Sequence, residues 1–413
     1  MKRFFLLTLA SAALLGASAA PVKTYEVKSP DGRLALVLTA GERLSFTVAR
    51  DGETLVAPSE MALTLSTGEV LGESPRVRSA RRRAVTETID APLYRQSRFD
   101  AAYNELDLRL RGDYGILARA YDDGVCYRFY TERDGELTIV DETAQLNFEG
   151  DPSAYIPYSK TEIPMRTSFE NTYEYAPLSK FRTQTVAFMP VLVDLGERGY
   201  VLYTESDVEA YPGVYLTYDK EAKGFAARFA ECPTETSLTK RFQDVVERSA
   251  DYIARVDGRR SYPWRIVAYA ATATELPVND MVWQTAEASR VADASWVRDG
   301  KIAWDWWNNW GVYGVDFKSG INTETYKYFI DFAAANGIEY VALDEGWGVR
   351  DGDVMHVVPE IDLPEIVSYA REKKVGIILW VVAKVLDDKL EEACRYYSEL
   401  GVAGWKVDFI DRQ

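Results

Sequence analysis

Acidic, aromatic and basic side chains that could do chemistry follow short apolar runs in the last third of the sequence. Asp408 ends an apolar run that begins at Val402, and Lys406 stands two residues before it. Such a run predicts an inner strand of a parallel α/β sheet, where catalytic groups stand at the C-terminal strand ends. A carboxylate kept ionised by a lysine can act as a nucleophile. The alternative is an aspartate that only caps the strand or pairs with Lys406.

Three earlier apolar runs also end in polar or aromatic residues. The first leads into Trp304-Asp305-Trp306-Trp307-Asn308-Asn309-Trp310, the second into Asp344-Glu345-Gly346-Trp347, and the third contains Trp380 and is followed by Lys384. Indole faces stack on sugar rings, while carboxylates and amides bind vicinal hydroxyls. Single tryptophans are more often core residues, but four in seven positions cannot all be core. We therefore predict a carbohydrate site formed by Trp304, Asp305, Trp307, Asn308, Asp344, Glu345, Trp380 and Lys406.

Glycoside hydrolysis requires two carboxyl groups, about 5–5.5 Å apart for retention and about 6.5–9.5 Å apart for inversion. Asp408 is the one convincing candidate in this sequence and suits the nucleophile that attacks the anomeric carbon. We expect its partner acid on a strand beyond the end of this chain.

Composition excludes several other functions. The formal charge is −16 over 413 residues, which disfavours nucleic-acid binding. His356 is the single histidine, and Cys126, Cys232 and Cys394 lie far apart, so neither histidine-dependent nucleophilic catalysis nor a cysteine-rich metal site is indicated. A bound metal would be a hard, oxygen-liganded cation such as calcium.

The spacing of apolar residues divides the chain into several regions. From Tyr25 to about Ala270, period-two alternation broken by Asp-Gly turns predicts a large antiparallel sandwich, and the basic run Arg76 to Arg83 is read as a solvated loop or strand edge. A short helix over 280–288 and a linker follow. We place the sandwich at 21–275, the helical linker at 276–300 and a catalytic α/β domain at 301–413.

From Lys301 onward strands and helices alternate. We predict strands at 302–304, 338–343, 375–382 and 402–409, with helices capped by Asn322 or Thr323, opened by Pro364, and capped by Asp387 or Asp388. Three strand–helix units and a fourth strand make about half of a (β/α)₈ barrel. The predicted fold is therefore multidomain β plus α/β: an antiparallel β-super-sandwich and the first half of a barrel, truncated after strand four. An open doubly wound sheet is the alternative.

The N-terminus has the layout of a secretory signal. Met1-Lys2-Arg3 precedes an apolar run from Phe4 to Leu15 and then small residues up to Ala20. The run is too short for a stable membrane anchor. We expect residues 1–20 to be removed from a secreted protein that is not inserted in a membrane.

Several segments resemble glycoside hydrolase family 97. Four of them are similar to barrel segments of that family, and Thr204 to Asp207 with Tyr211-Pro212-Gly213 is similar to the signature of its N-terminal β-domain; the barrel segments are 296–308, 343–347, 380–386 and 404–409. The resemblance implies a β-super-sandwich, a (β/α)₈ barrel and a small C-terminal β-domain, and a calcium-assisted exo-glycosidase. It also implies that the protein is located in the periplasm and comes from a member of the Bacteroidota.

The resemblance is stronger to the retaining branch of the family. Inverting members carry a glutamate after strand three, in a His-His-Glu-Thr type sequence, and lack the strand-four aspartate. This chain reads Trp380-Val381-Val382-Ala383-Lys384-Val385-Leu386 after strand three and carries Asp408. By resemblance Asp408 is the nucleophile, Lys406 and Asp344 contact substrate hydroxyls, and Glu170, or alternatively Glu174, is a calcium ligand.

The resemblance leaves several functions open. An α-galactosidase that cleaves terminal α-galactosides through a covalent glycosyl-aspartate is the leading hypothesis. A retaining β-L-arabinopyranosidase or an α-glucosidase of the same family is the nearest alternative. A catalytically incomplete sugar-binding fragment is the alternative from another class. The expected partner is an oligosaccharide, and the oligomeric state is open.

Overall fold

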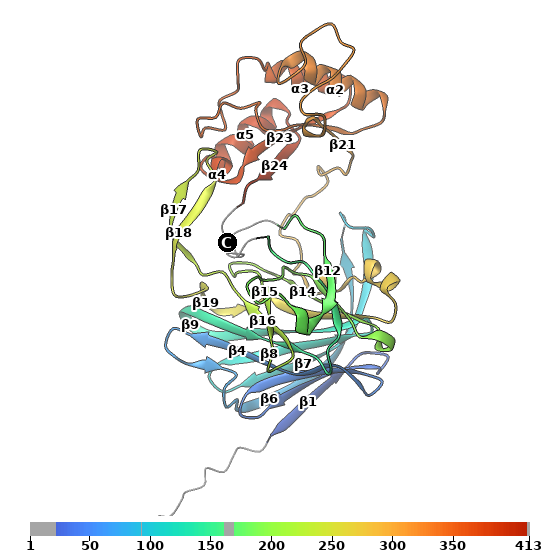
Figure 1. Cartoon of the computed structure of the whole chain (residues 1–413), viewed down its shortest axis with the longest axis vertical. Helices are drawn as coiled ribbons and strands as arrows, with labels where there is room; N and C mark the ends of the chain where they lie inside the picture. Colours follow the sequence, from blue (N-terminus) through green and yellow to red (C-terminus); the bar gives the residue numbers. More distant parts are fainter. Residues whose placement is uncertain (1–21, 92, 161–168, 411–413) are drawn as a thin grey trace, which may run out of the picture.

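The computed structural model describes residues 22–91, 93–160 and 169–410, which form an antiparallel β-sandwich followed by an α/β unit (Figure 1). The predicted signal, residues 1–20, lies outside the described residues. No helix among those residues is long and apolar enough to cross a membrane.

The sandwich is built from long antiparallel strands. Those of its first half are β1 (Lys23–Lys28), β2 (Leu34–Ala40), β3 (Leu44–Arg50), β4 (Glu53–Leu65), β5 (Val70–Leu71), β6 (Val77–Asp90), β7 (Arg98–Leu110), β8 (Tyr114–Tyr121), β9 (Gly124–Ala144) and β10 (Leu146–Asn147). Those of its second half are β11 (Ser153–Ile156), β12 (Glu174–Pro177), β13 (Val191–Asp194), β14 (Tyr200–Ser206), β15 (Tyr215–Asp219), β16 (Gly224–Arg228), β19 (Ala254–Ser261) and β20 (Trp264–Ala270). Two single-turn 3₁₀ helices, Leu178–Lys180 and Gly196–Arg198, interrupt them.

Turn residues place the hairpins where the sequence predicts them. Between β1 and β2, the Leu34 N–H donates to the Ser29 hydroxyl at 2.9 Å, and Gly32 supplies a positive φ of 76°. Asp122 and Asp123 lie in the turn between β8 and β9. In β2 the residues alternate between buried and partly exposed, as expected for a strand with one face on a core.

The interior of the sandwich contains a charged group as well as apolar residues. The guanidinium of Arg265 is 1% exposed, and it donates to Glu142 at 2.7 Å and to Glu205 at 2.5 Å. Because a buried cation is costly without partners, these two carboxylates are what allow Arg265 to occupy the core.

One long strand forms an edge of the sandwich. β6 pairs with β7 along its length and with no other named strand, and most of its residues are exposed. Arg81, Arg82 and Arg83 lie on it. The sequence reading of this basic run as a solvated strand edge is confirmed.

A separate hairpin reaches from the sandwich to the α/β unit. It consists of β17 (Pro233–Leu238) and β18 (Asp244–Ser249), which pair only with each other and form a two-stranded sheet (Figure 1).

The connection from the sandwich to the α/β unit runs from residue 271 to residue 301. It contains a 3₁₀ helix, Ala273–Val278, and then α1 (Met281–Thr285), which is shorter than the helix predicted over 280–288. Asp280 precedes α1 and pairs with Arg95 at 2.7 Å, which fixes this segment to the sandwich.

The α/β unit is a four-stranded parallel sheet in sequence order. Its elements are β21 (Ile302–Trp304), a 3₁₀ turn (Asp305–Asn308), α2 (Thr323–Ala335), β22 (Tyr340–Leu343), α3 (Leu363–Glu372), β23 (Gly376–Val382), α4 (Ala383–Asp387), α5 (Leu390–Leu400) and β24 (Gly404–Asp408). The predicted alternation of strands and helices is thus confirmed. β21 has the predicted bounds, whereas β22, β23 and β24 are shorter than predicted by two, one and three residues.

Helix starts follow the capping signals in two of the three cases. The Asn322 side chain accepts from the Thr325 N–H at 3.0 Å, and the Asp362 side chain accepts from the Glu365 N–H at 2.9 Å. The third prediction was wrong, because residues 383–387 form the extra helix α4, and α5 begins after Lys389 without a side-chain cap. Asp387 and Asp388 therefore end one helix and do not open the next.

Candidate active site

The C-terminal ends of the four parallel strands bring the predicted residues together. In the register, Trp304 lies beside Ala342, Trp380 beside Lys406, and Val382 beside Asp408. Because these strands are parallel, the residues that follow each strand lie along one edge of the sheet. This edge faces the sandwich (Figure 1).

Asp408 is held by three donors. Its Oδ2 accepts from Lys406 Nζ at 2.6 Å and from Trp380 Nε1 at 2.9 Å, and its Oδ1 accepts from the Phe409 N–H at 2.8 Å. Partial burial raises the pKa of Asp408, but these hydrogen bonds and the Lys406 charge outweigh it, so the pKa lies below its ordinary value. The group is therefore an oriented carboxylate anion, and its side chain is 40% exposed.

Lys406 is placed between two carboxylates and two indoles. Its ammonium lies 2.6 Å from Asp408 and 3.5 Å from Asp344. It also lies 5.1 Å from the centre of the Trp304 ring and 5.9 Å from that of Trp380. Ion-pair and cation–π interactions together fix a flexible side chain that would otherwise sample many rotamers.

Trp304 and Asp344 form a second hydrogen-bonded pair beside Lys406. The indole N–H of Trp304 donates to Asp344 Oδ2 at 2.6 Å. Trp306 stacks on the Trp304 ring at 5.1 Å, with 20° between the planes. Since Trp306 and Lys406 both cover this indole, Trp304 orients Asp344 and offers little ring surface of its own.

Asp305 lies beneath the site. It is 0% exposed, accepts from the Tyr326 hydroxyl at 2.7 Å and accepts from the Asp344 N–H at 3.2 Å. Burial raises the pKa of Asp305 to about 6, although its hydrogen bonds act in the opposite direction. In this structure the side chain supports the strand end that carries Asp344 and is not at the surface of the site.

The remaining predicted residues lie at the rim. Trp307 is 74% exposed, and Asn308 beside it is exposed too. Glu345 forms an ion pair with Arg350 at 2.8 Å. The structure thus brings Trp304, Asp344, Trp380, Lys406 and Asp408 into one connected set, with Asp305 below it and Trp307, Asn308 and Glu345 around it.

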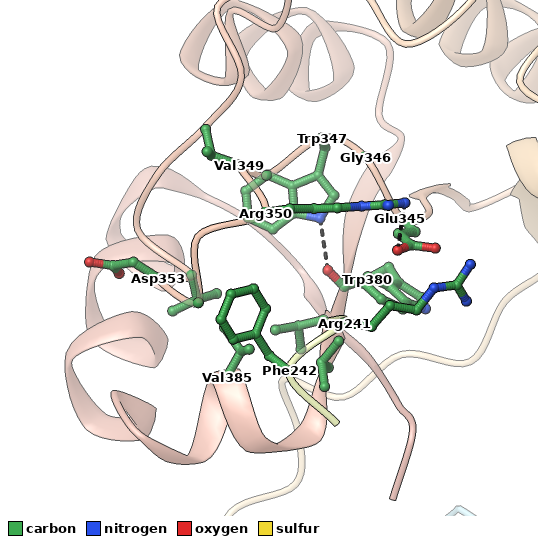
Figure 2. A pocket seen from close by; sticks show the side chains of 15 residues that line it. Arg241, Phe242, Glu345, Gly346, Trp347, Val349, Arg350, Asp353, Trp380 and Val385 are labelled. Carbon is green, nitrogen blue, oxygen red and sulfur yellow. Dashed lines mark hydrogen bonds and ion pairs between the residues drawn. The ribbon is translucent and has the colours of Figure 1, made fainter. Parts of the chain in front are cut away.

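Sequence reasoning missed two residues that the hairpin brings to this edge. Arg241 and Phe242, at the tip between β17 and β18, line a pocket with Glu345, Trp347 and Trp380 (Figure 2). Figure 2 also shows the Trp347 indole donating to the Trp380 carbonyl, at 2.8 Å. An Arg-Phe pair in a short turn is the only sequence signal for this contact, and it is a weak one.

The two predicted calcium ligands do not belong to a cluster of further possible metal ligands among the described residues. Glu170 is exposed and pairs with Lys160 at 3.3 Å, while Glu174 pairs with Arg182. Within the described ranges, no group of three or more histidine, cysteine, aspartate or glutamate side chains could hold a metal ion. Calcium takes six to eight oxygen ligands, so the described residues do not make a site for it.

The fold and this edge define a class of protein. A β-sandwich precedes a parallel α/β sheet whose strand ends hold a lysine-supported carboxylate among tryptophans, as in carbohydrate-active enzymes. Sequence models of one family match both parts: "Glycosyl-hydrolase 97 N-terminal" over residues 27–287 and "Glycoside hydrolase 97" over residues 306–413. The chain belongs to glycoside hydrolase family 97.

Two curated relatives are similar over nearly the whole chain. A "Retaining alpha-galactosidase" of Bacteroides thetaiotaomicron is 42% identical over 399 residues, which are 94% of this chain and 60% of that protein. A "Probable retaining alpha-galactosidase" of Streptomyces bingchenggensis is 30% identical and is covered over 56% of its length. The chain therefore spans a little more than half the length of these relatives.

Solved structures confirm the similarity of fold. A family 97 enzyme from Pseudoalteromonas sp. strain K8, in complex with acarbose, superposes with a TM-score of 0.78 at 18% identity, over 94% of this chain and 59% of that one. A beta-arabinopyranosidase superposes with a TM-score of 0.75 at 21% identity, over 94% of this chain and 62% of that one.

Proposed function

We propose that the protein is an exo-acting retaining glycoside hydrolase that removes terminal α-galactosyl units through a covalent glycosyl-aspartate. The main observation behind the proposal is that three hydrogen bonds orient the Asp408 carboxylate at the C-terminal end of β24. The 42% identity to a retaining alpha-galactosidase supports the substrate.

In the proposed reaction an Asp408 oxygen forms a bond to the anomeric carbon while the bond to the leaving oxygen breaks. A carboxylate offers about four lone-pair sites. Two donors occupy Oδ2, whereas Oδ1 accepts one backbone N–H, so we assign the attack to Oδ1. Water then cleaves the glycosyl ester and regenerates the carboxylate. Among the described residues we assign none to protonation of the leaving group.

Other predicted residues take supporting roles in this proposal. Lys406 and Asp344 bind hydroxyls of the galactosyl ring, and Trp380 orients the nucleophile. Glu345 and Asn308 stand where further hydroxyls would be bound. Trp307, with 74% of its surface exposed, offers the largest free indole face of the predicted set.

Further parts of the proposal depend on the family resemblance. The parallel sheet would be the first half of a (β/α)₈ barrel, with residues 21–275 as sandwich and 301–413 as catalytic domain. Residues 1–20 would direct secretion, to the periplasm. Glu170 would give calcium one oxygen ligand, provided that others come from outside the described residues.

Three alternatives are kept. A β-L-arabinopyranosidase would share the hydroxyl contacts, since its substrate differs by the C5 substituent, and an α-glucosidase is the third specificity. A sugar-binding protein without turnover is the alternative from another class. Galactose binding without turnover of an aryl α-galactoside, which needs little acid assistance, would favour the binding protein.

Proton NMR of the first sugar released tests the mechanism. A nucleophile on the β face makes a β-linked intermediate and hence α-galactose as the first product. We expect the α anomer before mutarotation begins. Initial β-galactose would show that Asp408 activates water instead, and the covalent mechanism would be abandoned.

A further inference from the structure

The hairpin that links the two parts of the molecule has a tip held by several hydrogen bonds. The Thr239 hydroxyl accepts from the Arg241 N–H at 3.1 Å and from the Gln243 N–H at 3.2 Å, and the Phe242 N–H donates to the Thr239 carbonyl at 3.0 Å. Phe242 has a positive φ of 61°, which is uncommon for an aromatic residue. A turn held in this way presents its two tip side chains in fixed directions.

Phe242 anchors this tip on the α/β unit. Its ring lies against Gly352, where an added Cβ would lie 2.9 Å from the ring and would force it to shift. Val349 and Val385 line the same pocket (Figure 2). The contact joins residues more than 100 positions apart in sequence and holds the hairpin against the loop that follows β22.

Arg241 is thereby carried to the rim of the candidate active site. Its guanidinium lies 5.8 Å from the centre of the Phe409 ring, and Phe409 follows Asp408 directly. The Phe409 ring in turn lies 5.8 Å from that of Trp380.

The charge of Arg241 is free for a ligand. Two other cations at this edge are paired, Lys406 with Asp344 and Asp408, and Arg350 with Glu345. Among the described residues no carboxylate forms an ion pair with Arg241, and its side chain is exposed in a chain of charge −16. A guanidinium offers five donors in a planar fork, which suits neighbouring hydroxyl oxygens.

We propose that Arg241 is a specificity-determining residue that binds the leaving-group sugar through a pair of its hydroxyls. This inference rests on the proposed function. The galactosyl ring would occupy the set around Asp408 and Lys406, and the second sugar would extend outward past Phe409 to the hairpin. The hairpin of the sandwich domain would thus contribute to selectivity for the leaving-group sugar.

Binding measurements on an Asp408→Ala background test the inference without turnover. Titration calorimetry would compare galactose with the disaccharide α-galactosyl-(1→6)-glucose. For Arg241→Ala we expect disaccharide affinity to fall about tenfold, equivalent to ~1.4 kcal/mol, while galactose affinity stays within about twofold, since the single ring does not reach the hairpin. Arg241→Lys should recover little of the loss because it lacks the fork.

Two further variants separate this role from a structural one. Arg248→Ala removes another arginine of the same hairpin, one that pairs with Glu235, and should change neither affinity. Phe242→Ala should reproduce the selective loss for the disaccharide, because the tip loses its anchor. Equal effects of Arg241→Ala on both sugars, or none on either, would overturn the inference while leaving the proposed function intact. Absence of galactose binding by the Asp408→Ala protein and of aryl galactoside turnover by the wild type would overturn both.

Discussion

At the scale of the residue, the two oxygens of Asp408 have different roles: Oδ2 orients the carboxylate and Oδ1 is the proposed attacking atom. Lys406 and Trp380 hold Oδ2, and the Phe409 N–H leaves Oδ1 with a free lone pair. Removal of the carboxylate should therefore abolish the chemistry while leaving sugar binding near normal, because a nucleophile acts chiefly in the transition state.

Asp408→Gly should have almost no turnover, and azide should restore it. The smaller side chain opens the β face to the external anion, so the product should be a β-galactosyl azide, identified by NMR. Asp344→Gly is the matched control, since it also removes a carboxylate beside Lys406 and should gain nothing from azide. Rescue of the control, or an α-azide from Asp408→Gly, would contradict the assignment.

The hydrogen bond from the Trp380 indole should affect the pH dependence of kcat/KM. Its hydrogen bond helps to lower the pKa of Asp408, so Trp380→Phe should raise that pKa. The acidic limb of kcat/KM should then move to higher pH, because the nucleophile must be ionised to attack. Trp306→Phe removes an indole that stacks on Trp304 and should leave the limb where it is; a shift of equal size in both variants would count against the prediction.

Asp305 should make stability depend on pH. Burial raises its pKa to about 6 in the folded protein, above about 3.9 for an unfolded chain. The fold thus binds this proton more tightly, and the stabilisation present below pH 4 is lost as the pH rises to 6. In urea unfolding, Asp305→Asn should gain up to ~3 kcal/mol relative to wild type between pH 4 and 7. The exposed Asp299→Asn should show no such trend; the same trend there would refute the assignment to Asp305.

At the scale of the element, the contact that anchors the β17–β18 hairpin can be tested by substituting two glycines that have nearly the same φ. Gly352 and Gly68 have φ values of 83° and 84°, but an added Cβ meets the Phe242 ring at Gly352 and nothing within 4 Å at Gly68. Alanine at either position costs about 1–2 kcal/mol of strain. Only Gly352→Ala should also release the hairpin, seen as faster proteolysis or hydrogen exchange over residues 239–243. Equal exchange in both variants would mean that Phe242 is not the anchor.

Sequence patterns predicted elements better than contacts between distant elements. The starts of α2 and α3 were predicted from Asn322 or Thr323 and from Pro364, because a helix start is decided within a few residues. The gathering of Trp380, Lys406 and Asp408 was foreseeable too, since parallel strands end at one edge. The Arg241–Phe409 contact was not, because a two-residue tip has no periodicity and its partner lies far along the chain. The extra helix α4 was missed because Asp387 and Asp388 look equally like the start of one helix and the end of another.

At the scale of the whole molecule, the two parts have separate cores. The largest buried cluster includes Phe46 and lies wholly in the sandwich, while Ile330 belongs to a cluster confined to the α/β unit. Two cores that share no buried residue can unfold as separate cooperative units.

Calorimetry should therefore resolve two unfolding transitions. Phe46→Ala and Ile330→Ala each truncate a side chain that is 0% exposed, at a cost of about 2–5 kcal/mol. Each substitution should lower the midpoint of its own transition and leave the other nearly unchanged, so each serves as the control for the other. A single transition that moves with both substitutions would show one cooperative unit.

The edge strand β6 bears on how copies of this protein meet one another. The outer edge of this 14-residue strand, opposite the edge that pairs with β7, presents backbone donors and acceptors that a second chain could extend into a continuous sheet. If two copies approached edge to edge, Arg81, Arg82 and Arg83 of each would be brought near the same three residues of the other. Repulsion between these cationic side chains would oppose edge-to-edge pairing, so neutralising them should increase self-association in solution.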